Sequence, residues 1–67
     1  MTEEEFVKLV LGIRVRETHI AAQIVALLSL AHTGFDTTEA EKALRSEADA
    51  LTALRIYHAT VVEERDP

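Results

Sequence analysis

The stretch Thr33-Gly34-Phe35-Asp36-Thr37-Thr38-Glu39-Ala40 decides the fold, because it ends one helix and starts another within a few residues. Gly34 supplies the left-handed backbone conformation that commonly closes a helix and that residues with a Cβ atom resist. Asp36 stands at the N-cap position of a second helix, and Glu39, three residues later, completes a capping box. We therefore expect a tight turn over residues 33–36 between two helices.

The residues at the start of the chain repeat this capping pattern. Thr2 and Glu5 have the spacing of a second capping box. Apolar residues then recur at helical spacing, which predicts a first helix over about residues 3–32 and a second over about 37–64. A turn this short makes the two helices antiparallel neighbours. The sequence thus predicts an all-α fold, an antiparallel helical hairpin forming one domain over residues 1–67, in which facing residues have numbers that sum to about 70.

Length and composition indicate how such a hairpin is stabilised. A chain of 67 residues is marginal as a monomer, and small domains usually need a disulfide, a metal ion or oligomerisation. The chain has no Cys, and its three His are too far apart in sequence to share one helix turn. Oligomerisation is therefore the means of stabilisation that we expect.

Charge limits the classes of partner. The net charge of −5 argues against nonspecific binding to nucleic acid or to an anionic membrane. Glu3, Glu4 and Glu5 follow the first two residues, which is the opposite of the positive start of a signal peptide. The longest uncharged run, residues 19–35, is shorter than a membrane span of about 20 apolar residues. We expect a cytoplasmic protein that does not enter a membrane.

The first helix carries more apolar surface than one neighbouring helix can cover. Apart from the stripe that faces the second helix, it has a further set of apolar residues: Val7, Leu11, Val15, Ala22, Val25 and Leu28. A helix with a single neighbour needs one apolar stripe, about 100° wide. We expect the surplus to pair with a second copy of the chain in a homodimeric four-helix bundle, through an interface of Ile20, Ile24, Val25, Leu27 and Leu28. Another protein docking on the first helix is the alternative.

Three polar residues, Glu17, Glu47 and His58, lie on or beside the apolar stripes. We expect them to form a buried polar network that fixes the register of the helices. Di-metal sites in helical bundles use Glu-x-x-His, whereas the chain has Glu17-Thr18-His19, so no metal or other cofactor is expected. A general acid–base pair through His58 would lack a nucleophile and a cleft, so no enzyme activity is expected.

The turn also carries a resemblance. The run from Gly34 to Leu44, followed by Leu51, Leu54 and His58, resembles a group of very short alphaproteobacterial proteins with a Gly-x-Asp-Thr-Thr-Glu-Ala-Glu motif between two helices. That resemblance implies a two-helix fold over roughly residues 17–64 and carries no catalytic residue over. The predicted architecture is also similar to the repressor of primer, a dimeric helical hairpin that binds paired RNA hairpins.

These observations favour a noncatalytic protein-interaction module, a small homodimeric regulator or scaffold. An RNA-binding regulator like the repressor of primer is the alternative, and a metal- or cofactor-binding bundle ranks below it. Lys8, Arg14 and Arg16 form the only basic concentration that could contact RNA phosphates. The acidic residues around them favour a solvated face of ion pairs over a nucleic-acid site.

Overall fold

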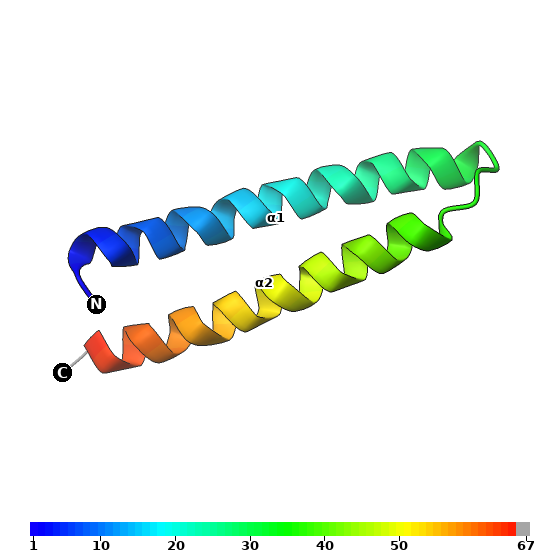
Figure 1. Ribbon diagram of the computed structural model, residues 1–67. Coiled ribbons are helices and arrows are strands. Elements are labelled where there is room, and N and C mark those ends of the chain that lie inside the picture. Colours follow the sequence, from blue (N-terminus) through cyan, green and yellow to red (C-terminus); the bar gives the residue numbers. More distant parts are fainter. Residues whose placement is uncertain (66–67) are drawn as a thin grey trace.

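Two antiparallel helices make up the protein, as seen in a computed structural model that describes residues 1–65. Helix α1 spans Glu3–His32 and α2 spans Thr38–Arg65, with no strand in the described residues. The first turn of α1 and the last turn of α2 share one end, and the connecting turn lies at the other (Figure 1). The molecule is a rod measuring 53 × 15 × 13 Å. The predicted all-α helical hairpin is confirmed.

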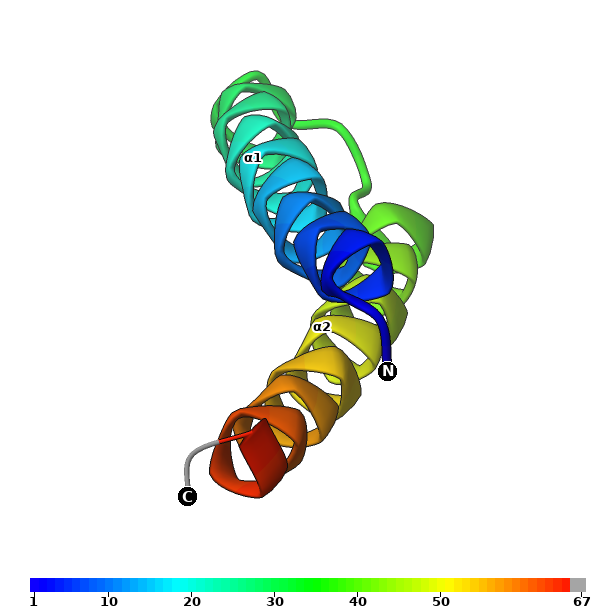
Figure 2. The same ribbon diagram turned by 90° about the vertical axis from the view of Figure 1, so that its left-hand side faces the viewer.

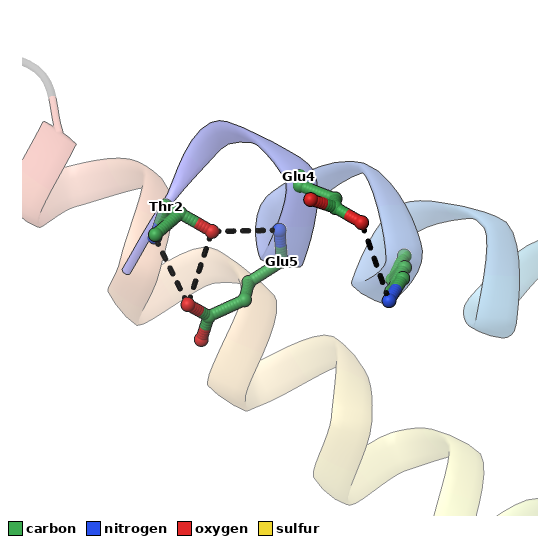
Figure 3. Close-up of polar contacts among 4 residues, drawn as sticks. Thr2, Glu4 and Glu5 are labelled. Carbon is green, nitrogen blue, oxygen red and sulfur yellow. Dashed lines mark hydrogen bonds and ion pairs between the residues drawn. The ribbon is translucent and has the colours of Figure 1, made fainter.

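A complete capping box starts α1. The hydroxyl oxygen of Thr2 accepts a hydrogen bond from the backbone N–H of Glu5 at 3.1 Å, and the Glu5 carboxylate accepts one from the backbone N–H of Thr2 at 3.4 Å (Figure 3). These bonds give two N–H groups at the helix start partners that they would otherwise lack. The acidic first turn of Glu3, Glu4 and Glu5 also suits the positive end of the helix dipole. The predicted capping box of Thr2 and Glu5 is therefore confirmed.

Gly34 closes α1 as predicted. Its φ is +86°, in the left-handed region, and the backbone N–H groups of Phe35 and Gly34 donate to the carbonyls of Leu30 at 3.2 Å and Ala31 at 3.1 Å. This pair of bonds is a Schellman motif, which satisfies carbonyls left unpaired at the end of a helix.

The predicted capping box of Asp36 and Glu39 is wrong in its details. The carboxylate of Asp36 accepts from the backbone N–H of Thr38 at 3.0 Å and from its hydroxyl at 2.7 Å. The first backbone bond of α2 joins the N–H of Glu41 to the carbonyl of Thr37, so the helix starts at Thr38, one residue later than expected. Glu39 pairs with Lys42 at 3.7 Å and is not placed to complete a box. Asp36 still stabilises the helix start, through a turn that precedes the helix.

The contact between the helices follows a seven-residue spacing, which we call the seam. On α1 the seam includes Phe6, Ile13, Ile20 and Leu27. On α2 it includes Leu44, Leu51 and His58 and, three residues after each of these, Glu47, Leu54 and Val61; all are buried or half-buried. A spacing of seven residues, or 3.5 per turn, is that of a two-stranded coiled coil. The helices are inclined to one another rather than strictly parallel (Figure 2).

The core along this seam is thin. Ile13, Leu51 and Val61 are the only buried apolar side chains among the described residues, at 8%, 6% and 5% exposure. No polar or charged residue in the same part of the chain is buried. Each of two packed helices covers only one narrow strip of the other's surface, so most of the surface of each helix stays in contact with solvent.

Residues in polar or aromatic contact across the two helices have numbers that sum to between 64 and 72, against the predicted sum of about 70. Gln23 donates from Nε2 to Glu47 at 3.4 Å across the seam, and Arg55 pairs with Glu17 at 3.2 Å. The other amide atom of Gln23, Oε1, is buried without a hydrogen-bond partner. This polar contact in mid-seam opposes a slip of one helix along the other, because a slip would leave further polar atoms unpaired.

Candidate interaction surface

The side of α1 that faces away from α2 carries a continuous row of apolar and small residues. We call this row the outer stripe; it consists of Val7, Leu11, Val15, Thr18, Ala22, Val25 and Ser29. Residues two apart on a helix point about 200° apart. Leu11 and Val15 each lie two residues from the buried Ile13, so they point away from the seam.

The spacing between residues of the outer stripe matches the period of an α-helix. From Val7 to Val25 there are five steps over 18 residues, or 3.6 residues a step, which is the α-helical period. The stripe therefore runs nearly straight along the helix for about 33 Å from Val7 to Ser29. Such a straight row presents one flat face to a long partner rather than a local pocket.

The apolar members of this face are well exposed. Val15 and Val25 are 68% and 65% exposed, and the adjoining Leu28 is 62% exposed. Between Thr18 and Ala31 α1 has no charged residue that would oppose burial of the face. Scattered apolar residues on a surface are ordinary, but a continuous uncharged row of them is typical of an interface.

The two hydroxyl groups of the outer stripe are already satisfied. Thr18 donates from Oγ1 to the carbonyl of Arg14 at 3.1 Å, and Ser29 donates from Oγ to the carbonyl of Val25 at 3.1 Å. Burying an unpaired hydroxyl is costly, whereas burying a paired one is not. A partner could therefore cover the stripe without offering hydrogen bonds in return.

The total exposed surface is large for a protein of this mass. The accessible area is 5247 Å² for 7.4 kDa, whereas a globular monomer of that mass exposes about 4,200 Å². The excess of about 1,000 Å² is close to the roughly 800 Å² that each partner contributes to a standard interface. The hairpin thus has enough uncovered surface for one stable association.

The five residues expected at a dimer interface do not share one face. Ile20 and Leu27 lie half-buried in the seam against α2, on the opposite side of α1 from the outer stripe. Val25 and Leu28 point outward, and Ile24, at 42% exposure, lies between the two faces. The sequence analysis missed Thr18 and Ser29, whose helical spacing from Val25 could have placed them on the same row.

The expected buried polar network is also wrong. Glu17 pairs with Arg55 at 3.2 Å and is exposed, while Glu47 is half-exposed and lies 3.5 Å from His19. His58 is not joined to either carboxylate by a hydrogen bond or an ion pair in the described residues, and it lies against Phe6 instead. The three residues therefore act separately, because two helices alone enclose no interior large enough to hold them together.

An aromatic and cationic cluster joins the two helices at the end of the hairpin opposite the turn. The rings of Phe6 and His58 stack with their centroids 5.5 Å apart, and the guanidinium carbon of Arg65 lies 4.2 Å from the centroid of Phe6. Arg65 also binds the carboxylate of Glu3, from the first turn of α1. These contacts hold the two helix ends together where no covalent turn does so.

Most of the basic side chains are engaged with carboxylates. Lys8 pairs with Glu4 at 3.5 Å, one turn back along α1 (Figure 3). Lys42, Arg55 and Arg65 likewise pair with acidic residues, which makes four of the seven Lys and Arg residues. The other two basic residues of α1, Arg14 and Arg16, form no ion pair within residues 1–65.

Two further tests concern metals and membranes. Within residues 1–65, no three His, Asp or Glu side chains gather closely enough to hold a metal ion. Neither α1 nor α2 has the length of apolar sequence needed to cross a lipid bilayer.

No protein family, curated protein or solved structure matches the chain.

Proposed function

We propose that the chain is a noncatalytic protein-interaction module that acts as a homodimer, with two hairpins joined through their outer stripes into a four-helix assembly. The observation that carries the proposal is the straight, uncharged and exposed outer stripe on α1. In this assembly α1 is central because it has an apolar row on both sides, and α2 lies outside.

A second copy fits this surface better than a chemically different partner. A closed symmetric dimer is the commonest soluble assembly, and it lets one flat apolar face cover an identical one. The satisfied hydroxyls of Thr18 and Ser29 allow such a face to be buried without complementary donors on the other side. The dimer would serve as a small regulator or scaffold, leaving the outer surface of α2 for other contacts.

The test is the mass of the native protein in solution over a wide range of concentrations, together with its thermal unfolding. We expect a dimer at high concentration and a melting temperature that rises with concentration, because association stabilises the folded chain by mass action. A protein that stays monomeric, with a melting temperature independent of concentration, would contradict the proposal. The outer stripe would then be a docking surface for a different protein.

A further inference from the structure

We infer that the two copies pair with their α1 helices antiparallel, about a two-fold axis that passes beside Thr18. This inference rests on the proposed homodimer and specifies its geometry. The occupant of the outer stripe is thus the same stripe of a second copy, running in the opposite direction. Residues that face each other then have numbers that sum to about 36.

The outer stripe is nearly symmetric about Thr18. Val7 and Ser29 each lie 11 residues from it, and Leu11 and Val25 each lie seven residues from it. An antiparallel pairing centred there brings each member of the stripe onto another member. It also overlaps α1 along its whole length, because the midpoint of Glu3–His32 lies beside Thr18. No other antiparallel centre covers as much of the stripe.

The sizes of the facing side chains are complementary under this pairing. Val15 meets the small Ala22 of the second copy, and the larger Leu11 meets Val25. Large residues opposite small ones allow two helices to approach closely without leaving voids. Met1 and Phe35, which lie just outside the two ends of α1, are 54% and 67% exposed in the single hairpin.

Charge favours the antiparallel direction over the parallel one. Glu4 lies in line with the outer stripe at one end of α1, and His32, the basic residue of the last turn, lies at the other. An antiparallel pair places Glu4 opposite His32 and sets the positive end of each helix dipole beside the negative end of the other. A parallel pair would bring the two acidic first turns together, where like charges repel.

Cysteine cross-linking tests the geometry, because the chain has no Cys of its own. Leu11→Cys and Val25→Cys are made as separate chains, mixed, and oxidised with glutathione disulfide, and the products are identified by mass. We expect the mixed Leu11→Cys to Val25→Cys disulfide as the main product, and little disulfide when either chain is oxidised alone. A disulfide forms readily only where the two Cα atoms come within about 7 Å.

Two single-cysteine chains serve as controls. Thr18→Cys should cross-link to itself, since it lies on the proposed two-fold axis. Asp49→Cys, exposed on α2, should form no disulfide between two chains under the same conditions, and only a mixed disulfide with glutathione. Circular dichroism and solution mass of each reduced variant establish that the substituted chains still fold and associate.

The outcomes separate this inference from the proposed function. A native chain that is monomeric overturns both. A dimer in which Leu11→Cys and Val25→Cys each cross-link to themselves keeps the homodimer and overturns the antiparallel direction. A dimer in which none of the α1 cysteines cross-links overturns pairing through the outer stripe.

Discussion

Replacing Val25 by Glu should dissociate the proposed dimer, and the size of the change in the dissociation constant follows from the exposed fraction of Val25. Val25 is 65% exposed in the single hairpin, so pairing can still bury about two-thirds of it. Full burial of such a side chain is worth about 1.5–3 kcal/mol, which leaves about 1–2 kcal/mol for each copy and about 2–4 kcal/mol for a symmetric dimer. At about 1.4 kcal/mol for each factor of ten, the dissociation constant should rise by roughly 30- to 700-fold. Desolvation of the new carboxylate adds to this loss.

Ile56→Glu is the matched control for this substitution. Ile56 is 64% exposed on α2, so in a single hairpin the two β-branched side chains have nearly the same exposed fraction. The assay is sedimentation velocity with circular dichroism on both variants and the native chain, each at several concentrations. We expect the Val25→Glu chain to lose association and helix content, and the Ile56→Glu chain to keep both.

Equal behaviour of the two variants would refute this reasoning. If both remain dimeric, the outer stripe is not the interface; if both dissociate, α2 takes part in the contact as much as α1 does. A Val25→Glu chain that is monomeric yet keeps its full melting temperature would show that the hairpin needs no partner for stability.

Three further predictions concern the hairpin itself. Gly12→Ala should stabilise the chain by about 0.5–1 kcal/mol in thermal unfolding, because Gly12 lies within α1 and an added Cβ would have nothing within 4 Å; a lower melting temperature would reveal a close neighbour at that position. Leu51→Ala should cost about 2–5 kcal/mol in denaturant unfolding, since Leu51 is one of the three apolar side chains that are buried in the described part of the chain. A loss below about 1 kcal/mol would mean that the seam is not the core. The hydrogen bonds from Thr38 hold the pKa of Asp36 below its usual value of 3.8. The stability contributed by the Asp36 carboxylate should therefore be complete above the unfolded pKa of about 3.9 and lost as pH falls through the lower folded pKa. Asp36→Asn should remove that part of the acid dependence in melts between about pH 2 and 5, and an unchanged dependence would contradict the assignment.

The elements of the fold follow from local chemistry that sequence alone displays. The Thr2 box and Gly34 mark the helix ends because capping uses backbone groups and neighbouring side chains only. The short turn then fixes the antiparallel register, so the contacts of Gln23 with Glu47 and of Glu17 with Arg55 lie close to the predicted sum.

The candidate surface was harder to predict because it depends on which side of an apolar helix faces its neighbour. Around Ile20 to Leu28, α1 is apolar on nearly every side, so periodicity at 3.6 residues a turn does not choose between faces. The seven-residue spacing of Phe6, Ile13, Ile20 and Leu27 was the signal that assigns Ile20 and Leu27 to α2. Burial of Glu17 and Glu47 was predicted from their position on a stripe, but long side chains at the edge of a two-helix contact reach solvent.

The thin seam has a consequence for the lifetime of the chain. With three buried apolar side chains within residues 1–65, a lone hairpin opens more often than a larger domain, and each opening exposes its backbone to proteases. Pairing through α1 would suppress this opening, so degradation would remove solitary copies faster than paired ones. The abundance of such a protein would then respond steeply to its rate of synthesis. Copies made slowly would be degraded before they pair, and copies made rapidly would pair and persist.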